Sequence, residues 1–205
     1  MPPSQALLPF IANAVDDKGD HPLENVRETA AVNYEFWPYL SESDCHPCEP
    51  DVLLRISEHQ GREFIVLIEA KYLSGKSSER DERERPNDQL AREHDNLRLV
   101  ADKEKRIPIL IYLTAGLGFP EDEIEASKSE LHHDRNITVD FYWLSWRHLF
   151  PVIENAEEPV LKHLAQLMRK ISLLFFNRRS LFLLDIKLFF FCVILWSVCV
   201  WCVDI

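Results

Sequence analysis

Continuous apolar runs mark two places in the chain where buried strands are expected. Residues 64–72 read FIVLIEAKY and residues 106–115 read RIPILIYLTA, and such runs are typical of strands covered on both faces of a sheet. Residues 49–57 (EPDVLLRIS) and 137–146 (ITVDFYWLSW) are also predicted to be strands. The turn expected at 59–63 joins the segments on either side of it as a hairpin, with 64–72 as a central strand.

Three further segments have the pattern of helices. Residues 22–40 open with a proline and acidic residues, which suit a first helical turn, and Pro38 is expected to end this helix. Residues 87–103 place apolar residues on one side, with Asn87 as the expected cap. Residues 147–172 are predicted to be helical as well.

The order of these elements predicts the fold class. Helix, two strands, helix, strand, strand and helix follow one another, with residues 116–136 as a Glu-rich loop or short helix. A hairpin followed by a crossover helix implies an α/β fold, with a mixed β-sheet flanked by helices. In the 205-residue chain we expect an irregular arm over 1–20, one domain over 21–176 and a hydrophobic tail over 177–205.

Charge and cysteine usage narrow the functional class. The net charge of -11 argues against a protein that coats nucleic acid, although residues 161–187 carry six basic residues and one acid. Three of the five cysteines lie in the tail, and the N-terminus lacks the basic and apolar regions of a secretory signal. We therefore expect a cytoplasmic, reducing environment without a disulfide framework.

An acid and a base follow the first apolar run. Residues i and i+2 of a strand share a face, so Glu69 and Lys71 are expected to point the same way. Glu49 and Asp51 have the same spacing on the neighbouring strand of the hairpin. The pattern therefore predicts two or three carboxylates and one ammonium group at one edge of the sheet.

Carboxylates gathered in this way repel one another, and a divalent cation relieves the repulsion. Oxygen ligands with few protein carboxylates suit Mg²⁺, which takes further ligands from water and from substrate phosphates. A lysine beside such a cation can stabilise developing negative charge or help to deprotonate water. These are the requirements of phosphodiester hydrolysis.

The same residues resemble a known family. Glu49-Pro50-Asp51, then Glu69-Ala70-Lys71 on the next strand and Gln89 on the following helix are similar to the motifs of the PD-(D/E)XK nuclease superfamily. The resemblance covers roughly residues 22–150. It implies a restriction-endonuclease-like core of helix, three-stranded hairpin sheet, helix and strand.

The resemblance also implies a metal site. Asp51 and Glu69 would hold Mg²⁺, which Mn²⁺ can replace, with the backbone carbonyl of Ala70 as a third ligand and Glu49 as an accessory carboxylate. The implied activity is that of a Mg-dependent deoxyribonuclease. DNA is the implied substrate, and specificity would come from a homodimer or from a partner protein.

Further roles follow by motif position. Lys71 would be the catalytic cation, and Gln89 would orient the water or the metal site. Some branches add a glutamate from the first helix, and both Glu24 and Glu28 could serve.

Each motif has a plain structural interpretation too. Asp51 can be a turn residue after Pro50, and Glu69 with Lys71 a surface pair that contributes under about 1 kcal/mol. At the level of the whole protein, the alternative to a nuclease is a catalytically silent, membrane-tethered binding module that keeps the fold. Metal binding by the two carboxylates separates these alternatives.

The sequence CHPC at 45–48 has the spacing of half a zinc knuckle. A structural zinc site needs four ligands, usually from a second pair, and the remaining cysteines lie in the tail. Free thiols in a loop are therefore favoured.

A charged loop follows the central strand. Its start, SGKS at 74–77, lacks the leading glycine of a phosphate-binding loop, which argues against an NTPase. A solvated, self-neutralising loop is favoured over a flap that contacts DNA phosphates. In the second case the contacts would come from Lys76, Arg80, Arg83 and Arg85.

Aromatic residues crowd the last predicted strand. They could stack on nucleobases, but on a buried strand they more often form core. These residues are Phe141, Tyr142, Trp143 and Trp146.

The tail differs from the rest of the chain. Residues 188–203 read LFFFCVILWSVCVWCV, slightly short of the roughly 20 residues that span a bilayer. Basic residues precede this run and would keep the domain on the cytoplasmic face of a membrane if the tail is an anchor. The alternatives are a buried terminal helix and a non-native reading frame.

Overall fold

The computed structural model describes residues 6–24, 26, 29–43, 45–71 and 86–176. The charged loop with Lys76, Arg80, Arg83 and Arg85 lies outside the described residues, and so do Glu28 and the hydrophobic tail. Contacts divide the chain into two compact units, Ile11–Trp146 and Met1–Phe10 with Arg147–Ile205. The candidate site belongs entirely to the first unit.

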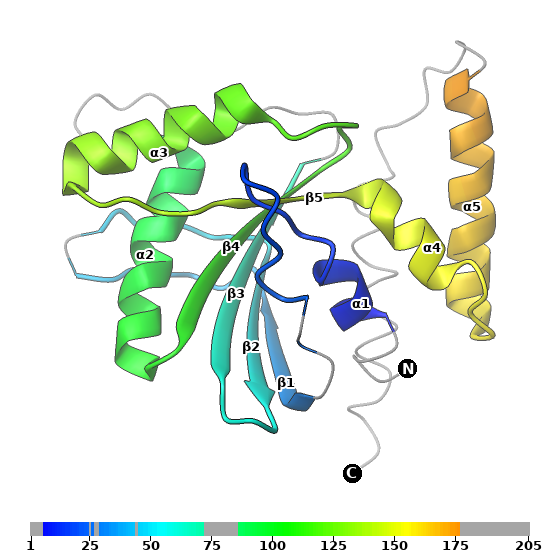
Figure 1. The fold of residues 1–205 in the computed structure, drawn as a ribbon, viewed down its shortest axis with the longest axis horizontal. Coiled ribbons are helices and arrows are strands. Elements are labelled where there is room, and N and C mark those ends of the chain that lie inside the picture. The colour runs from blue at the N-terminus through cyan, green and yellow to red at the C-terminus, as the bar shows by residue number, and fades with distance from the viewer. Residues whose placement is uncertain (1–5, 25, 27–28, 44, 72–85, 177–205) are drawn as a thin grey trace. The chain divides into compact units, whose positions relative to one another are not determined.

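A five-stranded mixed sheet forms the centre of the first unit (Figure 1). Its strands are β1 (Thr29–Phe36), β2 (Val52–Glu58), β3 (Glu63–Ala70), β4 (Ile107–Thr114) and β5 (Tyr142–Ser145), in that spatial order. The first two pairings are antiparallel and the last two are parallel. The predicted α/β class, a mixed sheet flanked by helices, is confirmed, and β3 is the central strand.

Two long helices connect the parallel strands, because a parallel pair needs a crossover. They are α2 (Gln89–Glu104), between β3 and β4, and α3 (Glu121–Arg135), between β4 and β5. The shorter elements are α1 (Leu7–Ile11), a 3-10 turn at Trp146–His148, and α4 (Leu149–Ile153). The last helix, α5 (Pro159–Phe176), belongs to the second unit, where the Arg169 guanidinium lies 5.3 Å from the centre of the Phe150 ring. In the described ranges, none of these helices has the length and apolar character needed to cross a bilayer.

The helix expected over residues 22–40 is wrong, because β1 occupies Thr29–Phe36. Val32, Tyr34 and Phe36 are half-buried, whereas the residues between them are exposed, which is the period-two alternation of a strand. Pairing with β2, from Phe36 opposite Val52, gives the backbone of this segment its hydrogen-bond partners.

The single helix expected over 147–172 is divided into the 3-10 turn, α4 and α5, and the arm expected to be irregular over 1–20 contains α1. The other elements differ from expectation mainly at their ends. The hairpin of β2 and β3 is confirmed, and Gly61 takes φ 88° in its turn, a conformation that suits glycine. Asp88, not Asn87, caps α2, because the Asp88 carboxylate accepts the backbone N–H of Ala91 at 3.0 Å. Residues 116–136 contain a helix of 15 residues, and β5 is only four residues long.

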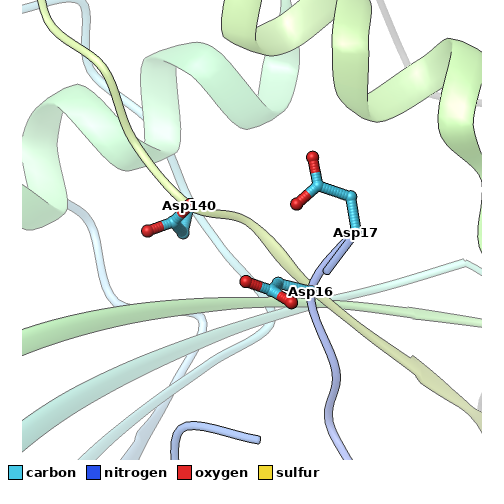
Figure 2. Close-up of side chains that lie close together, drawn as sticks. All are labelled: Asp16, Asp17 and Asp140. Carbon is cyan, nitrogen blue, oxygen red and sulfur yellow. The ribbon is translucent and has the colours of Figure 1, made fainter. Parts of the chain in front are cut away.

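The segment after α1 pairs with the last strand. The backbones of Val15 and Trp143 exchange two hydrogen bonds, of 3.0 and 2.8 Å. Beside this bridge the carboxylates of Asp16, Asp17 and Asp140 lie near one another (Figure 2). The N-terminal segment thus continues the sheet beyond β5.

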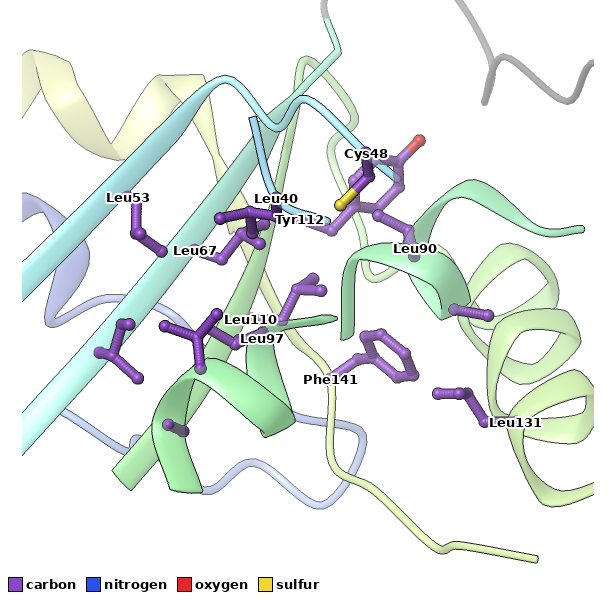
Figure 3. Packing of buried hydrophobic residues seen from close by; sticks show 14 of the residues in the cluster. Leu40, Cys48, Leu53, Leu67, Leu90, Leu97, Leu110, Tyr112, Leu131 and Phe141 are labelled. Atoms are coloured by element: carbon purple, nitrogen blue, oxygen red, sulfur yellow. The ribbon is translucent and has the colours of Figure 1, made fainter. Parts of the chain in front are cut away.

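The core lies between one face of the sheet and the two crossover helices (Figure 3). From the strands it takes Leu53, Leu67, Leu110 and Tyr112, and from the helices Leu90, Leu97 and Leu131. The predicted apolar side of α2 is confirmed as the side that packs on the strands. This packing fixes α2 against β3 and β4, and with it the position of the first turn of α2.

Candidate active site

The hairpin brings the two predicted motifs together at one end of the sheet. Asp51 directly precedes β2, and Glu69 and Ala70 are the last residues of β3. The register places Val52 opposite Ile68, and the backbone N–H of Ala70 donates to Oδ2 of Asp51 at 2.8 Å. This hydrogen bond holds the Asp51 carboxylate against the end of the central strand.

Lys71 and Glu69 form a buried ion pair at the same end. The Lys71 Nζ lies 2.7 Å from Oε1 of Glu69, and the two side chains are only 9% and 4% exposed. The backbone N–H of Lys71 donates to the carbonyl of Leu113 on β4 at 2.7 Å, which continues the parallel pairing past the end of β3. The predicted same-face placement of the pair is therefore present, but in the interior and not at the surface.

Gln89, the first residue of α2, reaches the pair from the crossover helix. Its Nε2 donates to Oε1 of Glu69 at 2.7 Å and to Oε1 of Glu93 at 2.9 Å. Two carboxylate oxygens accept only from the NH₂ end of an amide, so the orientation of the Gln89 side chain is fixed. The carbonyl end of the amide must face away from both acids.

Glu93 is a residue of the site that sequence reasoning missed. It is 1% exposed and lies one helical turn after Gln89. A signal was present, because Leu90, Glu93, Leu97 and Val100 follow the spacing of a buried helical stripe. An acid in such a stripe is costly unless it has partners. In the described part of the chain, its second oxygen, Oε2, has no hydrogen-bond partner.

The electrostatics of the cluster are dominated by burial. Desolvation and the charge of Asp51 raise the pKa of Glu69, although Lys71 and Gln89 counteract this by favouring the ionised form. Desolvation, and next the charge of Glu69, raise the pKa of Glu93 well above its usual range, with Gln89 opposing. Three acids face one lysine here, an excess of acid that protonation or a bound cation can relieve.

The donor set fits a divalent cation. Two carboxylates from adjacent strands lie at one end of the sheet, and Glu93 has a buried oxygen without a partner among the described residues. Oxygen donors of this kind suit Mg²⁺ or Mn²⁺. The excess of acid over base and the unpaired oxygen are features that a bound cation would relieve.

Other expected ligands lie apart from this cluster. Glu49 is exposed and precedes β2, so the alternation of a strand does not apply to it. Glu24 is exposed as well. Three metal-ligating side chains within 4.8 Å of one another occur, among the described residues, only at the aspartate cluster of Figure 2.

The aspartate cluster is neutralised from within the protein. Lys18 lies 3.1 Å from the carboxylate of Asp140, and Lys128 lies 2.6 Å from that of Asp17. Asp16 accepts the backbone N–H groups of Lys18 and Asp20, so it shapes a turn. These contacts account for the three acids without a metal.

The two loop cysteines have structural surroundings. The backbone of Cys48 exchanges two hydrogen bonds of 2.9 Å with Leu40, and its thiol is buried. Burial and a hydrogen bond to Asp95 raise the pKa of Cys45 to about 12, which disfavours the thiolate that zinc requires. Over the residues described, neither cysteine belongs to a group of three potential metal ligands.

The aromatic residues near β5 are mainly core. Phe141, Trp143 and Trp146 are buried, and the Trp143 indole N–H donates to the Thr114 hydroxyl at 2.9 Å. Tyr142 is half-buried. The core interpretation therefore fits these side chains better than stacking on nucleobases.

Comparison with protein-family models, with curated proteins and with solved structures finds no match to this chain. Functional inference therefore depends on the chemistry of the residues at the end of the hairpin.

Proposed function

We propose that the protein is a metal-dependent deoxyribonuclease with a restriction-endonuclease-like core. The observation that carries this proposal is the meeting of three separate segments at one end of the sheet. Glu69 contacts Lys71, which directly follows β3, and Gln89 of the crossover helix, whereas Asp51, just before β2, accepts the backbone N–H of Ala70. The order of three antiparallel strands, a helix and a parallel strand agrees with the core that the resemblance implies, apart from its first helix.

Asp51 and Glu69 would hold the metal in this proposal, together with the backbone carbonyl of Ala70. A bound Mg²⁺ or Mn²⁺ supplies Lewis acidity toward a phosphate and lowers the pKa of a water. Gln89 fixes the rotamer of Glu69 through its amide N–H, so that this carboxylate is oriented before a ligand arrives.

Lys71 provides the positive charge of the site. Its ammonium group is buried and lies 2.7 Å from Glu69, so its position is fixed in advance. A fixed cation stabilises negative charge that develops on the phosphate more effectively in a buried site than in water. Glu69 would thus serve both as a ligand of the metal and as the partner of the lysine.

Cleavage of supercoiled plasmid, linear duplex and single-stranded DNA, each with Mg²⁺, Mn²⁺ or EDTA, tests the proposal. We expect metal-dependent cutting that falls by about 100-fold or more in Asp51→Asn and in Lys71→Met. Asp17→Asn is the matched control, because it removes an exposed carboxylate from the separate aspartate cluster.

The proposal is contradicted if the wild-type protein cuts none of the three substrates and also binds no Mn²⁺. Calorimetry with Mn²⁺ then separates the alternatives. Binding that requires Asp51 and Glu69 would indicate a nuclease with a different substrate or a missing partner protein. No binding would favour the catalytically silent module.

A further inference from the structure

Two exposed aromatic side chains lie at the end of the sheet that carries the proposed active site. Trp37 is 50% exposed and Tyr39 is 69% exposed. Among the described residues, the other large apolar side chains with such exposure are Ile107 and Leu117, which are aliphatic. The two exposed aromatic residues are separated in the chain by a single residue.

Backbone contacts place this pair beside the candidate metal ligand. β1 ends at Phe36, which is paired with Val52, the residue after Asp51. The backbone N–H of Trp37 donates to the carbonyl oxygen of Asp51 at 3.1 Å. A backbone hydrogen bond therefore joins Trp37 directly to a residue of the proposed site.

The segment 37–40 is held at both of its ends. Leu40 exchanges two backbone hydrogen bonds of 2.9 Å with Cys48, and Trp37 is bonded to Asp51. Pro38 and Leu40 are buried, whereas Trp37 and Tyr39 are exposed. The backbone of this segment is thus anchored at both ends, and its two aromatic residues remain exposed.

The backbone of Trp37 is itself unusual. Its φ is 48°, in the left-handed region, which bulky residues rarely adopt. The other non-glycine residues with positive φ among those described, Lys105 and Asn136, are the C-caps of α2 and α3, where this conformation is common. Trp37 is not a helix cap but lies in the bend directly after β1, and residues held in such backbone conformations are concentrated at functional sites.

We propose that Trp37 and Tyr39 form a stacking platform for unpaired nucleobases of the DNA strand that is cut. Aromatic faces stack on bases of any identity, but those base faces are accessible only where the strand is single. The net charge of -11 repels phosphates at long range, so affinity for a strand must come from contacts that do not depend on charge, such as stacking. The platform rests on the proposed nuclease function and selects single-stranded or frayed DNA as its substrate.

Binding of a fluorescein-labelled dT₁₅ strand and of a 15-base-pair duplex to the full chain, measured by anisotropy in EDTA, tests the platform. We expect Trp37→Ala and Tyr39→Ala to weaken binding of the single strand about tenfold, with binding of the duplex unchanged. Trp37→Phe and Tyr39→Phe are expected to retain binding within about threefold, because a stacking face remains.

Ile107→Ala is the matched control. Ile107 is 48% exposed but starts β4 opposite Phe64, at the other end of the sheet. Trp37→Gly guards against misfolding as the cause of a loss, because glycine adopts positive φ readily while removing the ring. It is expected to unfold at the same temperature as wild type or higher, and to bind the single strand as weakly as Trp37→Ala.

Single-strand binding that is unchanged in both alanine variants, or absent in the wild type, would overturn the platform. Loss of a dimer in the alanine variants, seen by sedimentation without any change in DNA binding, would also overturn it and indicate a second copy of the chain as the occupant.

The failure of the nuclease proposal and the failure of the platform proposal can be told apart. Cutting that is lost in Asp51→Asn but unaffected in the platform variants would leave the nuclease without the platform, whereas platform-dependent binding without cutting would leave the platform alone.

Discussion

Glu93 provides a sharp test of the electrostatics of the site. Its carboxyl group is fully buried, next to Gln89, and its pKa is raised above the ordinary value of 4.5 by burial and by the charge of Glu69. The substitution Glu93→Gln keeps the shape of the side chain and its acceptor for Gln89 but removes the titration. We expect this substitution to change how stability depends on pH.

The sign follows from proton binding. Above pH 4.5 the unfolded chain releases the Glu93 proton, whereas the folded protein keeps it until its own raised pKa is reached. The folded state then binds more protons, so the free energy of unfolding falls as pH rises, by up to about 1.4 kcal/mol per pH unit for this one group. The pKa of Glu69 is raised as well and contributes with the same sign.

The assay is urea denaturation at pH 5, 6, 7 and 8 in EDTA, with the slope m checked at each pH. We expect wild-type stability to fall across this range and Glu93→Gln to remove a large part of the fall, with a residual slope from Glu69. Glu125→Gln, on the exposed side of α3, is the control and is expected to follow the wild type. A pH slope of Glu93→Gln equal to that of the wild type would contradict this expectation, since it would mean that Glu93 ionises normally in the folded protein.

Three further outcomes are expected. Lys71→Met should lower the free energy of unfolding by about 3–5 kcal/mol in urea titrations, because it leaves Glu69 buried without its cation, and Glu69→Gln combined with Lys71→Met should recover most of this loss. Leu67→Ala, in the centre of the core, should cost about 2–5 kcal/mol with m unchanged, and a cost under about 1 kcal/mol would contradict the packing. Asp88→Ala should cost about 1 kcal/mol in thermal unfolding and more than Asn87→Ala, and the reverse order would mean that the cap is misassigned.

The segment expected to be the first helix shows where sequence reasoning about the fold fails. The proline and acidic residues after position 21 imitate a helix start, and Val32, Tyr34 and Phe36 carry the competing period-two signal. The choice between helix and strand depends on the hydrogen-bonding partner β2, which lies further along the chain and is not part of the local pattern. An edge strand is stabilised by the exposed edge it covers, so its own sequence specifies it only weakly.

Some residues of the candidate site can likewise be predicted from the sequence, whereas others cannot. Alternation along β3 and the hairpin to β2 are sufficient to predict that Asp51, Glu69 and Lys71 lie together. The role of Glu93 is not predictable in this way, because an acid on a buried stripe has no local explanation until Gln89 is seen between it and Glu69.

Elements with a local signal can be predicted from the amino-acid sequence alone. The apolar runs of β3 and β4, the glycine turn of the hairpin and the apolar side of α2 all follow from residue type and spacing. In contrast, three features emerge only from tertiary contacts. They are the strand conformation of β1, the Gln89 amide that Glu93 shares with Glu69, and the backbone hydrogen bond from Trp37 to Asp51. Hydrophobic periodicity is a property of neighbouring residues, whereas hydrogen-bond partners and buried charges are satisfied across segments that meet only when the chain has folded.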